Sequence, residues 1–122
     1  MANAVARIPF SASTQGQGIK IVATVSAGTL VHTTGTSATI IDEVWLYLFN
    51  SDTVDRTATI EFGGATAPDQ NIVLTVPFKG GLILAVPGLI LLGSGAASLT
   101  VKVFAAAANV VTASGYINRV TP

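Results

Sequence analysis

The stretch IDEVWLYLF (residues 41–49) does most to set the fold of this chain. Successive side chains of a β-strand point to opposite faces of the sheet, so alternate residues share a face. One alternate set is aromatic and comprises Trp45, Tyr47 and Phe49. The other set is aliphatic and comprises Val44, Leu46 and Leu48. Both faces need cover: the aromatic face is either covered by a loop or the N-terminal arm of the same chain, or it is a subunit interface, where aromatic residues concentrate.

The rest of the chain repeats short β-branched and aromatic runs, separated by Gly, Ser, Asn and Pro. This spacing is typical of an all-β sandwich or barrel. Strands are expected near residues 6–10, 20–25, 29–33, 40–49, 57–62, 72–76, 82–86, 98–105 and 110–117. Turns are expected at residues 50–52, 63–64, 79–81 and 87–88, where the turn-forming residues cluster. The four alanines at 105–108 are too few for a stable helix and predict a tight connection.

These patterns predict a single-domain antiparallel β-sandwich formed by residues 19–122, with an extended N-terminal arm formed by residues 1–18. The segment SASTQGQG (residues 11–18) is expected to be the flexible joint of this arm. Residues 57–62 and 98–104 alternate between apolar and polar side chains and are expected to be half-exposed strands.

Charged residues make up 10% of the chain, compared with about 25% in an average protein, and the formal net charge is zero. Such a chain has no field that would attract nucleic acid or an anionic membrane. A monomer of this mass exposes about 6,100 Å², which leaves roughly 500 Å² for each charged side chain. Other protein is therefore expected to cover part of the surface.

The stretch GLILAVPGLILLGSG (residues 81–95) contains no charge. Its apolar run, residues 82–92, is shorter than the roughly 20 residues of a membrane-spanning helix and is interrupted by Pro87 and Gly88. We therefore expect this stretch to be buried by protein, with no membrane contact. The start of the chain, MANAVARIPFSAS, lacks the basic and apolar regions of a signal peptide.

No combination of residues predicts catalysis or metal binding. The chain has one histidine, His32, and no cysteine, so a Ser/His/Asp set would need a distant carboxylate and a metal site would need carboxylates. His32 is expected at the surface or in an interface. Asp42 and Glu43 are neighbours that point to opposite faces of a strand, so they cannot act jointly.

The segment SDTVDR (residues 51–56) comes closest to a metal loop, together with Glu61, but lacks the ligand spacing of an EF-hand. It is expected to be a hairpin tip in which Asp52 accepts backbone hydrogen bonds and Asp55 pairs with Arg56 or solvent. The glycines lack the strand, lysine and helix context of a phosphate-binding loop. We expect neither an enzyme nor a cofactor.

Three segments carry a family resemblance: IDEVWLYLFNSDTVDRTATIEFGG (41–64), NIVLTVPFKGGLILAVPGLILL (71–92) and VKVFAAAANVVTASGYINRV (101–120). Together they resemble small virion structural proteins of tailed bacteriophages, of the capsid decoration or cement protein type. The resemblance spans residues 38–120. Its most distinctive part is SGYINRV after the alanine-rich turn.

The resemblance implies a β-sandwich of jelly-roll type that forms trimers or related oligomers on the outer surface of the capsid. There it would bind and stabilise the major capsid protein. We expect capsid contacts at Arg7, Ile8 and Phe10. We expect an oligomer interface at Trp45, Tyr47, Phe49, Leu82 and Leu84.

The alternative is a receptor- or carbohydrate-binding module of a tail or head fibre. Exposed aromatic platforms flanked by Asn, Asp and Gln would favour it. Another assembly component, such as a head-completion or tail-tube protein, is a further option.

Overall fold

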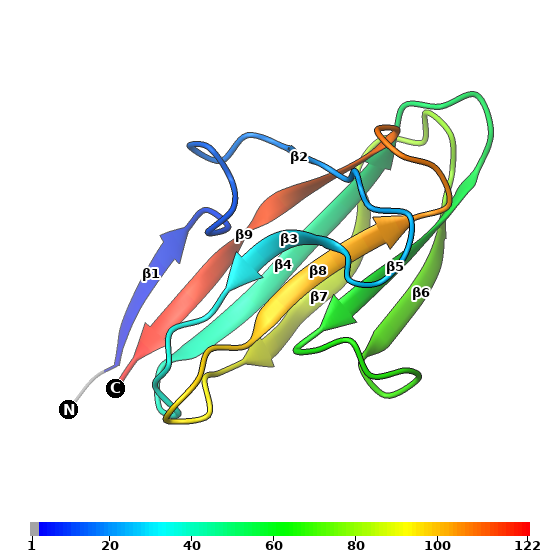
Figure 1. The fold of residues 1–122 in the computed structure, drawn as a ribbon. Helices are drawn as coiled ribbons and strands as arrows, with labels where there is room; N and C mark the ends of the chain where they lie inside the picture. Colours follow the sequence, from blue (N-terminus) through cyan, green and yellow to red (C-terminus); the bar gives the residue numbers. More distant parts are fainter. Residues whose placement is uncertain (1–2) are drawn as a thin grey trace.

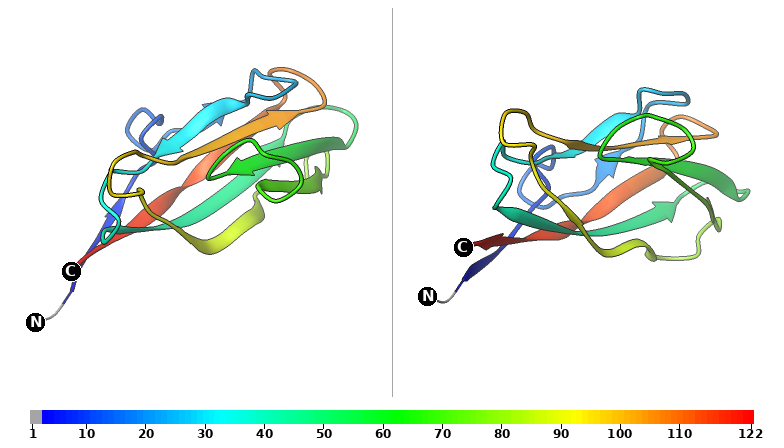
Figure 2. Two further views of the ribbon diagram at one scale, coloured as in Figure 1. Left: turned by 60° about the horizontal axis from the view of Figure 1, so that its bottom comes forward. Right: turned by 90° about the horizontal axis from the view of Figure 1, so that it is seen from below.

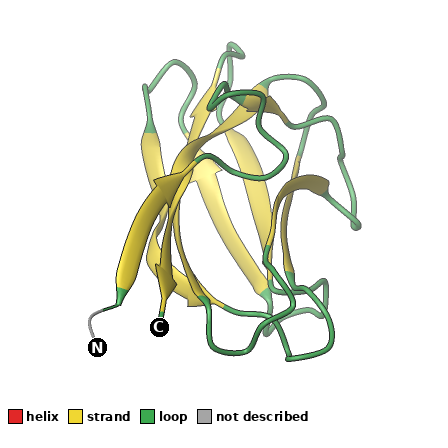
Figure 3. Cartoon of the chain, turned by 90° about the vertical axis from the view of Figure 1, so that its left-hand side faces the viewer, coloured by secondary structure: helices red, strands yellow, loops and turns green. Residues whose placement is uncertain are grey.

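The computed structural model describes residues 3–122, which form two antiparallel β-sheets packed face to face, with no helix in this range (Figures 1 and 3). The nine strands of this range are β1 (Ala4–Ile8), β2 (Ile19–Lys20), β3 (Thr29–Thr33), β4 (Ile41–Asn50), β5 (Arg56–Phe62), β6 (Asn71–Val76), β7 (Ile83–Leu91), β8 (Thr100–Ala105) and β9 (Val111–Thr121). The predicted all-β sandwich is confirmed.

The strand order is that of a jelly roll. The five-stranded sheet has the order β1-β9-β4-β7, with β2 also paired to β9, and the four-stranded sheet has the order β3-β8-β5-β6. From β2 onward the chain changes sheet at every connection except the β5–β6 hairpin, as Figure 1 lets the reader follow. Crossing between two sheets in this way produces the double Greek key of a jelly roll.

β4 is the central strand of the five-stranded sheet, between β9 and β7. It pairs with β9 without a register shift, from Ile41 opposite Val120 to Asn50 opposite Val111. Val44, Leu46 and Leu48, which the alternation placed on one face, point inward and are fully buried. Each such side chain stabilises the fold by about 1.5–3 kcal/mol relative to an exposed position. Together with Ile60, Val101 and Val103 of the opposite sheet, these residues belong to one hydrophobic core.

β7 is longer than predicted and runs straight through Pro87 and Gly88, where a turn was expected. Pro87 lies opposite Trp45 in the ladder, and the register shifts on both sides of this pair. β7 is an edge strand, and sheets tolerate proline on edge strands and at bulges. The turn prediction is therefore wrong because an edge strand with bulges tolerates the same Pro-Gly pair.

The N-terminal segment is part of the sandwich. β1 pairs with the last residues of β9, from Ala4 opposite Thr121 to Ile8 opposite Ile117, and Figure 2 shows this pair reaching past the rest of the sandwich. Phe10 is only 2% exposed and belongs to the core. Residues 3–18 are therefore not separated from the sandwich at the boundary expected after residue 18. The strand expected at residues 20–25 is shorter, since β2 comprises only Ile19–Lys20.

β5 is more buried than its alternation predicted. Thr59 and Glu61 lie on its outward set, yet they are 8% and 1% exposed. The loop before β3 covers this face: Ser26 donates a hydrogen bond to Glu61 Oε2 (2.5 Å), and the Gly28 amide donates one to Oε1 (2.7 Å). In β8, by contrast, Val101 and Val103 are buried while Thr100 and Lys102 are half-buried, as expected.

Replacing Gly115 with alanine tests how tightly β9 and β4 approach each other. Gly115 has φ +141°, and a Cβ there would lie 2.0 Å from the backbone oxygen of Trp45. Backbone in the middle of a sheet cannot give way, so we expect Gly115→Ala to lower the free energy of unfolding by about 3 kcal/mol or more. Gly35→Ala is the control, because a Cβ at Gly35 meets nothing within 4 Å. Equal urea midpoints for the two variants would contradict this packing.

Candidate functional site: an apolar interaction face

The outer face of the five-stranded sheet gathers the residues that the sequence predicted for an oligomer interface. We call it the interaction face and define it by Trp45, Tyr47, Phe49, Leu82, Leu84 and Tyr116. Tyr47 lies opposite Leu84 on β7, and Trp45 lies opposite Tyr116 on β9. Leu82 reaches the same face at its end, where it lines a pocket with Phe49. The structure thus brings all five predicted interface residues together; that they bind another copy stays a prediction.

The chain covers this face only in part. Arg7 of β1 lies over the ring of Tyr116, and Gly18 lies against Thr112 and Phe49 at the other end. The aromatic residues of β4 remain half-buried. The N-terminal segment thus covers the margin of the face and leaves its centre open.

The uncharged stretch at residues 81–95 is also more exposed than predicted. The exposed fractions are 61% for Leu82, 44% for Leu84, 44% for Leu89 and 55% for Ile90. One copy of the chain therefore does not bury these side chains, and their burial by other protein stays a prediction. Leu84, Leu89 and Ile90 lie on β7, which has no strand paired to its free side within residues 3–122, and Leu82 lies just before it. Leu84 and Ile90 lie opposite the outward residues Tyr47 and Glu43, so they add exposed apolar area to the outer face of the sheet.

The aromatic rings of the interaction face cover one another. The rings of Trp45 and Tyr116 are stacked, with centroids 6.1 Å apart and planes 17° from parallel. The Arg7 guanidinium carbon lies 4.9 Å from the centroid of the Tyr116 ring. On the β7 side, a Cβ at Gly88 would lie 2.9 Å from the Trp45 ring, so this glycine backbone packs against the indole. Trp45 is thus in contact with both neighbouring strands, β9 and β7, and remains half-buried.

The polar groups beside these rings bind one another. Trp45 Nε1 and Asn118 Nδ2 both donate to Glu43 Oε1, at 2.5 and 3.2 Å, and Arg7 Nε donates to Asn118 Oδ1 at 3.4 Å. The hydrogen bond from Trp45, followed by that from Asn118, lowers the pKa of Glu43. Arg7 and Glu43 carry opposite charges, so this part of the face has no net charge.

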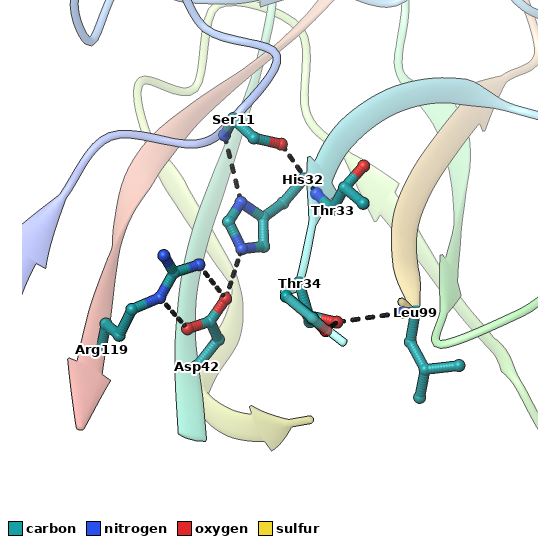
Figure 4. A network of polar contacts seen from close by, with 8 residues as sticks. Ser11, His32, Thr33, Thr34, Asp42, Leu99 and Arg119 are labelled. Carbon is teal, nitrogen blue, oxygen red and sulfur yellow. Dashed lines mark hydrogen bonds and ion pairs between the residues drawn. The ribbon is translucent and has the colours of Figure 1, made fainter. Parts of the chain in front are cut away.

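His32 lies in the interior, so its predicted surface position is wrong. Its side chain is 1% exposed, its Nδ1 accepts a hydrogen bond from the Ser11 amide (3.1 Å), and its Nε2 lies 2.7 Å from Asp42 Oδ2 (Figure 4). Arg119 donates two hydrogen bonds to Asp42, at 2.7 and 2.9 Å. One signal could have revealed this network: Asp42 shares the inward set of β4 with Val44, and a carboxylate in a core needs partners.

The Ser11, His32 and Asp42 arrangement is a structural link. Since Nδ1 accepts from a backbone amide, the neutral imidazole carries its hydrogen on Nε2 and donates it to Asp42. The Ser11 hydroxyl does not face the imidazole; its Oγ accepts a hydrogen bond from the Thr33 amide at 2.7 Å. A serine nucleophile needs its Oγ hydrogen-bonded to the histidine. What the three residues do here is join the N-terminal segment, β3 and β4.

Burial has opposite effects on the two titratable partners. Burial is the largest influence on His32 and lowers its pKa, against the hydrogen bond and charge of Asp42. Burial also acts most strongly on Asp42 and raises its pKa, but hydrogen bonds from Arg119 and His32 outweigh it, so the pKa is lowered. The hydrogen bond with Asp42 raises the pKa of Arg119.

The connection at residues 51–56 is polar, as predicted, but it joins β4 to β5 in the opposite sheet, so the predicted hairpin tip is wrong, and its ion pair also differs. Asp52 accepts a hydrogen bond from the Thr53 amide (2.8 Å), as expected, and it is Asp52 that pairs with Arg56, whose Nε lies 2.7 Å from Oδ2. Asp55 instead accepts from the Phe78 amide at 3.1 Å. Within residues 3–122, no group of three or more His, Cys, Asp or Glu side chains could hold a metal ion.

The three residues expected to contact a capsid have different environments. Arg7 is exposed and borders the interaction face, and Ile8 is half-buried. Phe10 is a core residue whose ring centroid lies 6.1 Å from that of His32. The contact predicted for Phe10 is therefore wrong, because its side chain is not available at the surface.

Comparison with protein-family models, curated proteins and solved structures finds no match to this chain. In residues 3–122, no helix is long and apolar enough to cross a membrane.

Stability should fall as the pH falls below the ordinary pKa of histidine. An unfolded His32 titrates near 6.5, and the folded one titrates lower, so between these values only the unfolded state binds the proton. The free energy of unfolding should therefore decrease from pH 7.5 to 5.5, by up to about 1.4 kcal/mol per pH unit. Asp42, whose folded pKa lies below 3.8, adds a loss in the same direction at lower pH.

Urea unfolding at pH 7.5, 6.5 and 5.5 measures this effect. His32→Gln is the matched variant, since it keeps a hydrogen-bond donor but cannot be protonated, and His32 is the single histidine of the chain. The variant should lose the pH dependence in this interval. The same slope in both proteins would show that His32 does not cause it.

Proposed function

We propose that this protein is a structural component of a bacteriophage virion, which binds the major capsid protein as an oligomer on the outer surface of the capsid and stabilises the shell. The observation that carries the proposal is the interaction face: half-buried aromatic and exposed aliphatic side chains on the outer side of one hydrogen-bonded sheet. Aromatic residues are enriched where proteins bind one another. The resemblance of residues 38–120 to capsid decoration proteins adds the virion context.

The charge of the chain suits self-association. Net charge is zero, and Arg7 and Glu43 balance each other beside the aromatic rings. Copies therefore approach without like-charge repulsion. An oligomer would also cover the exposed leucines of residues 82–89, whose exposure is otherwise hard to reconcile with a protein of such low charge.

The geometry of the rings favours this function over the carbohydrate-binding alternative. Jelly rolls serve both as viral capsid domains and as lectins, so the fold is compatible with either. A sugar stacks on a free aromatic face, whereas the Trp45 ring is stacked with Tyr116 and lies close to the Gly88 backbone. The most exposed side chains of the interaction face are the aliphatic Leu82 and Leu84, which suit packing against protein.

Charges introduced on the interaction face test the proposal. Tyr47→Glu and Leu84→Glu should dissociate the oligomer and weaken binding to purified shells at least tenfold, because each buries a carboxylate in an apolar interface. Binding is measured by co-sedimentation with shells that lack the protein. Both side chains point away from the core, so the free energy of unfolding should change by less than about 1 kcal/mol.

Val73→Glu is the control, because Val73 is 62% exposed on the other sheet. It should bind like the wild type.

Quantitative mass spectrometry of virions should find the chain in near-stoichiometric amount with the major capsid protein. Its absence from virions, or unchanged shell binding by Tyr47→Glu and Leu84→Glu, would overturn the proposal.

A further inference from the structure

An open pocket of about 630 Å³ lies at one end of the interaction face. Phe49 and Leu82 supply its apolar lining, while Lys79 and Ser114 supply polar groups. Its volume falls within the range of roughly 300–1,000 Å³ that binding pockets have. The pocket thus combines an apolar lining with one cationic side chain.

Buried hydrogen bonds fix the shape of this pocket. Asn50 is 2% exposed, and its Nδ2 donates to the backbone oxygens of Val54 and Val76, each at 2.9 Å. Its backbone oxygen accepts from the Lys79 amide at 2.8 Å. Lys79 is held in the left-handed region with φ 52°. The turn that carries Lys79 is therefore preformed and costs little entropy to bind.

Lys79 has no ion-pair partner within residues 3–122. Among the side-chain carboxylates of the same range, Asp69 is the one that takes part in no hydrogen bond or ion pair; the others are bonded to Arg119 and His32, Trp45, Arg56, the Phe78 amide or Ser26. Within residues 3–122, Asp69 is thus the unpartnered side-chain carboxylate, and Lys79 is the lysine without an ion pair that lines the apolar pocket; Lys20 and Lys102 also lack an ion pair but lie outside this pocket.

Asp69 lies on a projecting loop between β5 and β6, in which residues 65–69 are all exposed. The loop is closed by its own hydrogen bonds: the Gln70 amide donates to Thr66 O (2.9 Å), and the Thr66 amide donates to Gln70 Oε1 (2.9 Å). Pro68 places an apolar ring next to the carboxylate. The loop therefore offers an apolar and an anionic group side by side, as the pocket requires.

The loop and the pocket lie at opposite ends of the molecule. β5 and β6 are antiparallel, so the loop that joins them lies at the Phe62 end, while the turn that carries Lys79 follows Val76 at the other end (Figure 1). The loop of one copy therefore cannot reach the pocket of the same copy. Two copies can join them head to tail, and such contacts close into rings when the rotation between copies allows it.

We propose that the loop of residues 65–69 of one copy sits in the pocket of the next copy, with the Asp69 carboxylate on the Lys79 ammonium group and Pro68 against Phe49 and Leu82. This inference rests on the proposed function, because it names the partner that binds at one end of the interaction face. The partner is a second copy of the chain.

Charge reversal and its rescue test the contact. Lys79→Glu and Asp69→Lys each place like charges together, so each should raise the dissociation constant of the oligomer about tenfold, measured by sedimentation equilibrium. The double variant Lys79→Glu/Asp69→Lys restores an opposite pair with reversed polarity and should return to within about threefold of the wild type. Lys20→Glu, the same charge change at an exposed lysine outside the pocket, is the control and should not differ from the wild type.

Three results would overturn the inference: a wild type that stays monomeric, single variants that associate like the wild type, or a double variant as weak as the single ones. Shell binding of the wild type is measured separately. Shells that bind the wild type, together with charge reversals that have no effect, would reject the loop-in-pocket contact and leave the proposed function intact. Shells that do not bind the wild type would reject the proposed function itself.

Discussion

The buried carboxylate of Asp42 needs hydrogen bonds, and the residues that donate them come from both sheets. These hydrogen bonds therefore connect most parts of the structure. His32 reaches it from the four-stranded sheet, and Arg119 reaches it from the neighbouring strand of its own sheet. The imidazole that donates to Asp42 accepts from the Ser11 amide on its other side. Removing one partner of such a buried pair leaves an uncompensated charge, at a cost of about 3–5 kcal/mol. The network therefore ties the two sheets and the N-terminal segment to one another.

This anchoring explains why the N-terminal segment is not a free arm. Phe10 packs in the core next to His32, and Ser11 binds both His32 and the Thr33 amide. Because residues 10 and 11 are fixed, β1 lies next to β9 and pairs with it, and Arg7 lies over the Tyr116 ring. The interior network thus controls the margin of the surface that we propose binds other copies.

The interaction face is apolar because the chain has few charged side chains and because those near it are hydrogen-bonded or paired within the chain. Glu43 and Arg7 are bonded beside the aromatic rings, and Asp42 and Arg119 are paired in the interior. The outer side of the sheet is left with aromatic edges and leucines. Gly88 contributes by allowing the β7 backbone to lie against the Trp45 ring, where any side chain would collide with it. An apolar surface results, and the polar groups beside its aromatic rings are hydrogen-bonded within the chain.

The sequence by itself determined the properties that depend on alternation within a strand. It predicted the all-β fold and the separation of Val44, Leu46 and Leu48 on one face from Trp45, Tyr47 and Phe49 on the other, because side chains alternate wherever β4 lies. Only the tertiary structure decided which outward faces are covered. Glu61 is buried beneath a loop, Leu84 is open on an edge strand, and His32 and Phe10 meet in the core. Burial depends on segments that are distant in the sequence, and the periodicity of a strand does not indicate which of these segments pack together.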